Sequence, residues 1–147
     1  MSRIISFRGL MADSSTDTIP LHTTDGSTGY KIKALKLMSN NPSAVDQESV
    51  IQIWSVAQTG TPSLLIDFDD QTLLAVGFME GGVTHTALTN ETIVFDNITF
   101  NQDIYITHQD QQGGLCNYYL ELEQVTLDLN ENTVATLKDI RNIARTV

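Results

Sequence analysis

The chain has 147 residues, of which 41% are hydrophobic and 18% are charged, and its formal charge at pH 7 is −10. A domain of this length buries roughly two-thirds of the surface that its unfolded chain exposes, so it can fold without a metal or a disulfide. The longest apolar run, LLAVGFM from Leu73, is far shorter than the roughly 20 residues that cross a bilayer, and the N-terminal region has no apolar stretch of signal-peptide length. The sequence therefore predicts a folded domain with no membrane partner.

The positive charges lie near the two ends of the chain. Every Lys and Arg falls within the first 36 or the last 10 residues, whereas residues 37–137 hold 14 acids and no base. A phosphate backbone is bound through clustered Lys and Arg, so we expect no nucleic-acid partner for this acidic body. The basic ends are suited instead to acidic protein surfaces.

Residues 1–29 are predicted to form an N-terminal strand or extended arm followed by a polar loop. The segment RIISF, from Arg3, can pair as a strand or lie across a neighbour. Residues 12–29 are dominated by Ser, Thr, Asp, Gly and Pro, which favour loops. A structureless stretch of this length is uncommon inside a compact domain, so it indicates a functional or mobile segment.

Residues 30–129 are predicted to form a β-sandwich or jelly roll. The segment YKIKALKLM alternates Tyr30, Ile32 and Ala34 with lysines, as in a half-buried strand. Further strands are expected in SVIQIWSVAQT, LLIDFD, LLAVGFM, TIVFDNITF, DIYITHQ and CNYYLELEQVTLDL. Short strands with turn signals about every ten residues, and no crossover helix between them, predict an all-β, mainly antiparallel fold.

Residues 130–147 are predicted to form one short helix. Asp128 and Glu131 fit an N-terminal cap, and the cations near the other end suit the helix dipole. The helix would carry an apolar stripe of Leu137, Ile140 and Ala144 beside a basic row of Lys138, Arg141 and Arg145. We expect the stripe to pack on the sandwich or on a neighbouring subunit, and the basic row to meet an acidic surface.

No residue pattern predicts catalysis, a cofactor or a metal. Cys116 lies among strand residues with no local base, so we expect a buried structural thiol. The three histidines, His22, His85 and His108, lack metal-ligand spacing and are expected at the surface or in hydrogen bonds.

The segment IDFDDQT carries the densest group of acids, namely Asp67, Asp69 and Asp70. An EF-hand is excluded because Thr72 stands where glycine is required. A solvated turn is expected there, with a looser calcium site as the alternative.

The aromatic residues leave a second alternative open. Trp54, Tyr105, Tyr118 and Tyr119 either pack in the core and across strands or line a sugar-binding face. An exposed Trp54 or Tyr105 rimmed by Asp67 and Asp69 would favour the sugar-binding alternative.

The second half of the chain resembles small structural proteins of tailed-bacteriophage particles, particularly marine and cyanobacterial ones. The resemblance rests on FDNITFNQDIYI (95–106), the tyrosine-rich NYYLEL (117–122) and the closing TLKDIRN (136–142). It implies a non-enzymatic protein without cofactor that coats, cements or joins parts of a virion, usually in many copies.

From the resemblance and the charge layout together, we expect a capsid decoration or cement subunit located in the virion, which is assembled in the host cytoplasm. Its partners would be the major capsid protein or tail components and copies of itself, for example in a trimer. The candidate partner-binding residues are Arg3, Phe7, Arg8, Leu137, Lys138, Ile140, Arg141, Ala144 and Arg145. A tail-associated receptor- or carbohydrate-binding sandwich is the alternative.

Overall fold

The computed structural model describes residues 3–24, 26–42, 46–82, 89–95 and 98–127, which form eight strands and no helix. The strands are β1 (Arg3–Met11), β2 (Ser15–Ile19), β3 (Thr28–Ser39), β4 (Gln47–Trp54), β5 (Leu73–Gly81), β6 (Thr89–Val94), β7 (Ile104–Asp110) and β8 (Cys116–Thr126). The expected all-β class is therefore confirmed for these residues, and the predicted helix at residues 130–147 lies outside them.

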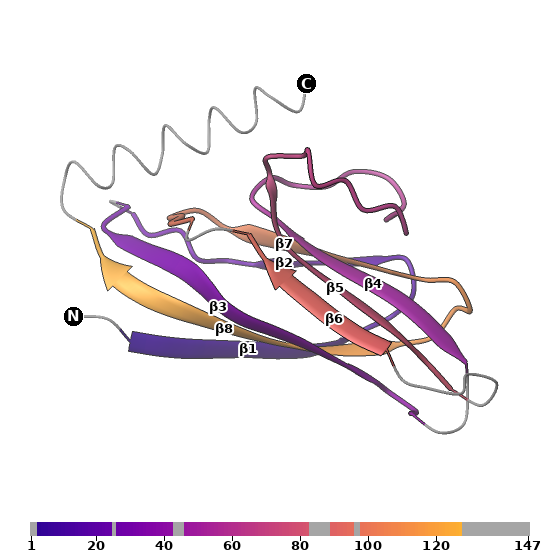
Figure 1. Ribbon diagram of the computed structural model, residues 1–147. Helices are drawn as coiled ribbons and strands as arrows, with labels where there is room; N and C mark the ends of the chain where they lie inside the picture. Colours follow the sequence, from indigo (N-terminus) through magenta and orange to yellow (C-terminus); the bar gives the residue numbers. More distant parts are fainter. Residues whose placement is uncertain (1–2, 25, 43–45, 83–88, 96–97, 128–147) are drawn as a thin grey trace.

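The strands form two antiparallel sheets that face each other (Figure 1). Sheet A has the order β1-β8-β3, and sheet B has the order β2-β7-β4-β5-β6. One hydrophobic core lies between them, contributed by the inward residues of both sheets, such as Leu120 and Leu122 of β8 and Ile51 and Ile53 of β4. All four of these side chains are fully buried.

The N-terminal region is part of both sheets. β1 pairs along its whole length with β8, and β2 pairs with β7. The segment RIISF was expected either to pair as a strand or to lie across a neighbour, and in the structure it pairs as part of β1. Residues 15–19, expected within a polar loop, form an edge strand instead, because Ile19 is buried in the core and the backbone of β2 completes the ladder of β7.

A β-bulge changes which residues of β3 face the core. The register with β8 shifts between Ile32 and Ala34, so Lys33 is an extra residue in the strand. The alternation therefore resets, and Leu35 is buried in place of the predicted Ala34. A bulge depends on the register with the neighbouring strand, which the alternation within β3 does not reveal.

The expected strand LLIDFD does not form. Residues 55–72 are the connection between β4 and β5, and within it residues 64–69 have no strand structure. The connection crosses the outer face of sheet B, as Figure 1 shows above β4 and β5. The apolar residues of this segment resemble a strand pattern in the sequence, yet Leu65, Ile66 and Phe68 are exposed in the structure.

The two sheets approach each other closely at Gly77 of β5. A Cβ atom at this position would lie 2.7 Å from Cδ1 of Leu37 on β3. The missing side chain therefore leaves the space that the Leu37 side chain fills, and close packing of this kind holds the sheets at a fixed separation.

Candidate interaction surfaces

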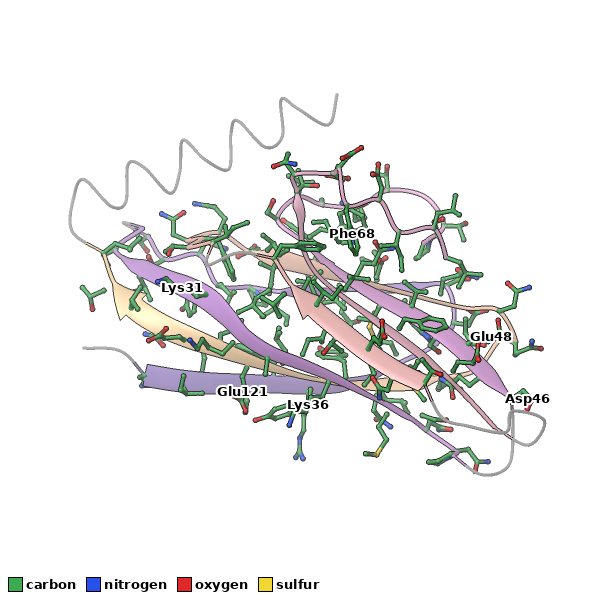
Figure 2. The ribbon with its side chains drawn as sticks, viewed as in Figure 1. Lys31, Lys36, Asp46, Glu48, Phe68 and Glu121 are labelled. Atoms are coloured by element: carbon green, nitrogen blue, oxygen red, sulfur yellow. The ribbon has the colours of Figure 1, made fainter. Side chains whose placement is uncertain are left out.

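The outer face of sheet A is basic, and no other described residue packs over it. Arg8, Tyr119 and Lys36 lie in one cross-strand row, because both Arg8 of β1 and Lys36 of β3 are in register with Tyr119 of β8. The neighbouring row consists of Leu10, Asn117 and Met38. Figure 2 shows Lys36 and Glu121 pointing away from the body on this side of the molecule.

These two rows form a groove of about 600 Å³ on the outer face. The Arg8 and Leu10 side chains of β1 flank one edge, and the Lys36 and Met38 side chains of β3 flank the other. Tyr119 is half-buried between them, and its hydroxyl donates a hydrogen bond to Glu121 Oε2 at 2.8 Å. The groove thus combines two cations with apolar walls and an aromatic ring.

Large apolar side chains on this face are left in solvent. Met38 is 65% exposed and Leu10 48%, and both lie in the row of Asn117, while Ile4, 55% exposed, lies further along β1 in register with Glu123. Apolar surface that lies together and is rimmed by charge is typical of protein interfaces, whereas a single exposed apolar residue is not. Nothing in the described part of the chain packs over them.

The charges of the described residues separate between the two sheets. The strands of sheet A hold five cations (Arg3, Arg8, Lys31, Lys33, Lys36) and two acids (Glu121, Glu123), a formal charge of +3. Lys33 is paired with Glu123 at 3.8 Å. The remaining described acids are Asp13, Asp17, Asp46, Glu48, Asp67, Asp69, Asp70, Glu80, Glu91, Asp103 and Asp110, so the rest of the described chain carries −11. Among the described residues, positive charge is therefore concentrated on the strands of sheet A.

On the opposite side, the connection between β4 and β5 presents an acidic and apolar loop at residues 65–69. Leu65 is 82% exposed, and Ile66 and Phe68 are also exposed beside Asp67 and Asp69. We call this segment the acidic loop. Figure 2 places Phe68 above sheet B, on the other side of the molecule from Lys36.

Local hydrogen bonds give the acidic loop a defined shape. Asp67 Oδ1 accepts from the Asp69 amide at 2.9 Å, and Asp70 Oδ1 accepts from the Thr72 amide at 2.9 Å and from its hydroxyl at 2.6 Å. The Phe68 ring packs edge-on against Phe95, with centroids 4.9 Å apart. The acids thus form turns, as the solvated-turn prediction expected.

Beneath the same connection lies a pocket of about 140 Å³, beside Trp54. Its lining includes the hydroxyl-bearing residues Thr59, Thr61, Ser63 and Thr107 and the side chain of Gln52. Trp54 is half-buried, and its Nε1 donates to Thr107 Oγ1 at 3.0 Å. Gln52 Oε1 is buried without a hydrogen-bond partner in the described structure. Asp67 and Asp69, expected to rim such a site, are not among its lining residues.

A Ser, a His and an Asp meet in the interior between the sheets, where Ser49 Oγ donates to Asp110 Oδ2 at 2.5 Å. His108 Nε2 lies 3.1 Å from Ser49 Oγ, and His108 Nδ1–H donates to the Ala12 carbonyl at 2.9 Å. In a catalytic triad the Asp orients the His, whereas here the Asp binds the Ser. Ser49 and His108 are both fully buried, so this cluster has the position and bonding of a structural network.

Cys116 lies next to this network and is buried, as predicted. Burial raises the pKa of its thiol to about 11, against a weaker opposing effect from the Ser49 hydrogen bond. The neutral thiol also contacts Met79 Sδ at 3.8 Å. A thiol with this pKa is a poor nucleophile near neutral pH.

The histidines outside this cluster do not form a metal site in the described structure. His22 Nδ1 lies 2.6 Å from Asp103 Oδ1 in an exposed pair, and His85 lies outside the described residues. Across the described residues, no group of three or more His, Cys, Asp or Glu side chains is placed to hold a metal ion.

The predicted partner-binding residues are only partly placed. Arg8 lies on the outer face of sheet A, Arg3 begins β1, and Phe7 is half-buried with its side chain packed against the core. The six candidates in the predicted helix, Leu137, Lys138, Ile140, Arg141, Ala144 and Arg145, lie outside the described residues. Leu10, Lys36 and Met38 were not predicted to bind a partner, and Tyr119 was considered only for a sugar-binding face. Their proximity depends on the pairing of three strands that are distant in the sequence.

Comparisons with known proteins identify no family. No family model matches the chain, and no curated protein matches it. A solved chain from a study entitled "Bacillus endospore appendages form a novel family of disulfide-linked pili" is similar over 87% of this chain and 92% of that chain, at 11% identity and a TM-score of 0.37. In the part of the chain that the structure describes, no helix has the length and apolar character required to cross a membrane.

Proposed function

We propose that the chain is a non-enzymatic structural subunit of a bacteriophage particle, and specifically a capsid decoration or cement subunit. The observation that carries the proposal is the outer face of sheet A, where cations and exposed apolar side chains surround a groove on an otherwise acidic molecule. A surface of this composition fits a protein partner, because apolar contacts supply affinity and charges select orientation. The resemblance of the second half of the chain to phage structural proteins supplies the identity of the particle.

The strand arrangement also suits this role. We propose that the two sheets form a variant of the jelly roll, an architecture found in viral capsid and lectin domains. The pairs β1–β8, β2–β7 and β4–β5 are nested as in a rolled hairpin. The fourth nested pair would be β3–β6, and these strands meet where Asn90 Nδ2 donates to the Leu37 carbonyl at 2.9 Å.

Co-sedimentation tests the proposed function. The purified protein is mixed with assembled shells of its source phage, pelleted, and compared with the double variant Arg8→Glu, Lys36→Glu. We expect the wild-type protein in the pellet with the shells and the double variant in the supernatant. Wild-type protein that stays in the supernatant with shells and with whole particles alike would contradict a virion role.

The Trp54 pocket favours a second candidate, a tail-associated receptor- or carbohydrate-binding module. Threonine and serine hydroxyls, the Gln52 amide and an indole ring are the groups that bind sugar hydroxyls and pack against sugar rings. The pocket of about 140 Å³ has the volume of roughly five water molecules, so it would hold one sugar unit at most.

Tryptophan fluorescence tests this candidate directly, because Trp54 is the only tryptophan. Titration with monosaccharides and with host surface glycans should change the emission of the wild-type protein in a saturable way. The variant Gln52→Leu, which keeps the bulk of the side chain, should lose that response. Unchanged emission across the titration of the wild-type protein would exclude a sugar site at this pocket.

A further inference from the structure

We propose that copies of this chain associate head to tail, with the acidic loop of one copy bound in the basic groove of the next. This inference rests on the assembly role proposed above and names the partner of the sheet A face as a second copy. The occupant is therefore residues 65–69 on the far side of another molecule.

The two surfaces match in chemistry. The groove offers the cations Arg8 and Lys36 beside the apolar Leu10 and Met38. The acidic loop offers alternating apolar and acidic residues, with exposed Leu65, Phe68 and Asp69 among them. Carboxylates of the loop would pair with the cations while its apolar side chains cover the groove walls.

The loop is also shaped for insertion. It projects from sheet B as a short turn held by the Asp67 and Asp70 hydrogen bonds, so little conformational entropy is lost when it docks. A projection of a few side chains suits a groove of about 600 Å³ better than a flat sheet face would. This is the reason for assigning the loop as the occupant rather than the acids spread over sheet B.

The placement of the two surfaces sets the kind of assembly. They lie on opposite sides of the molecule, so the contact is heterologous, and repetition gives a ring or an open chain rather than a closed two-fold dimer (Figure 2). The net charge of −10 opposes association at long range. At physiological ionic strength the Debye length is about 8 Å, so this repulsion is screened more than the direct ion pairs of the contact.

Matched charge variants of the full chain test the proposal by light scattering at physiological salt. The groove variant is Arg8→Glu, Lys36→Glu. The loop variant is Asp67→Asn, Asp69→Lys, in which the asparagine side chain keeps an oxygen that can accept the hydrogen bond from the amide of residue 69. The control is Asp17→Asn, Glu91→Lys, which makes the same change of charge at exposed positions of β2 and β6.

We expect the scattering mass of the wild-type protein and the control to rise with concentration above the 16.2 kDa of the monomer. Each of the groove and loop variants alone should stay monomeric, because like charges then meet at the contact. Mixing the two variants should restore association, since the basic groove of one faces the unaltered acidic loop of the other. This rescue also shows that both variants are folded.

Several outcomes would overturn the proposal. A wild-type protein that stays monomeric at all concentrations, a control that dissociates like the loop variant, or a mixture that remains monomeric would each do so. The proposed function has a separate readout, because wild-type protein that stays monomeric in scattering can still co-sediment with shells. In that case the virion role stands and the head-to-tail contact is wrong.

Discussion

The outer faces of the two sheets differ in what covers them. On sheet B, Val50 and Val76 point outward yet are only 3% and 4% exposed, because the connection between β4 and β5 lies over that face. On sheet A, Leu10 and Met38 also point outward, and both remain largely exposed. Both sheets thus carry apolar residues on their outer sides, and the described residues cover only one of them.

The difference indicates where a partner acts. Residues 55–72 cover sheet B from within the same chain, so the conformational entropy of this connection is lost when the protein folds. The Gln52 side-chain amide donates a hydrogen bond to the Leu65 carbonyl at 3.3 Å, which links the connection to the sheet. The sheet A face has no such cover among the described residues. An apolar side chain left exposed contributes to stability only when another surface removes it from water.

The largest expected effect compares one substitution on both faces. Val50→Asp should lower the free energy of unfolding by about 3 kcal/mol or more, because a carboxylate is buried without a partner. Met38→Asp should change it by less than about 0.5 kcal/mol, because the side chain stays in solvent. Urea denaturation followed by Trp54 fluorescence measures both. Equal losses from the two variants would show that the sheet A face is covered as well.

The next effect separates the shape of the acidic loop from its charge. Asp70→Ala removes the acceptor of two Thr72 hydrogen bonds and should cost about 1–2 kcal/mol of stability. Asp69→Ala is the matched control, and it should leave the unfolding midpoint unchanged while weakening self-association. A stability loss from Asp69→Ala as large as that from Asp70→Ala would mean that both acids are structural.

A smaller effect compares the two sides of β8. Cys116 faces the core, with a pKa of about 11, and should not react with a thiol reagent at pH 8 until the protein unfolds. In the double variant Cys116→Ser, Asn117→Cys, the new thiol lies in the groove and should react quickly. Rapid labelling of wild-type Cys116 in native buffer would contradict the packing described for the interior.

The raised thiol pKa also predicts a pH dependence of stability. The unfolded thiol ionises near pH 9.0, whereas the folded one stays neutral until about 11. The contribution of Cys116 is therefore complete below pH 9 and is lost as the pH rises through that window. Cys116→Ala should flatten the alkaline part of the stability curve.

The smallest effect lies outside both faces, at Asp103. Burial acts to raise the pKa of this carboxyl, but hydrogen bonds from the His22 side chain and from the His22 and Leu21 amides outweigh it, so the pKa falls below its usual value. A lowered pKa stabilises the fold above the ordinary value of 3.8, and this stabilisation is lost as the pH falls through the lower value. As the pH is lowered through that range, the Asp103→Asn variant should lose less stability than the wild-type protein. An equal loss of stability in the two proteins would contradict the contact between Asp103 and His22.

The class of fold follows from patterns within single segments, but the interaction surface does not. Alternation in β3, β7 and β8 is visible in the sequence, because one side of each strand is more deeply buried than the other. The sequence of β5 is a continuous apolar run instead, because both of its sides are buried. The bulge at Lys33 and the groove of Arg8, Tyr119 and Lys36 depend on which strands pair and in what register. The predicted strand LLIDFD was wrong for a related reason, since apolar residues of a connection that face solvent can follow the same pattern as a strand.

The most direct test of the central claim is the labelling rate of the groove thiol in Cys116→Ser, Asn117→Cys. The rate is measured at protein concentrations below and above the point where the scattering mass rises, and again with assembled shells added. We expect labelling to slow when molecules associate or bind shells, because the sheet A groove becomes covered. A rate that stays constant while association or binding proceeds would show that the groove is not the interface.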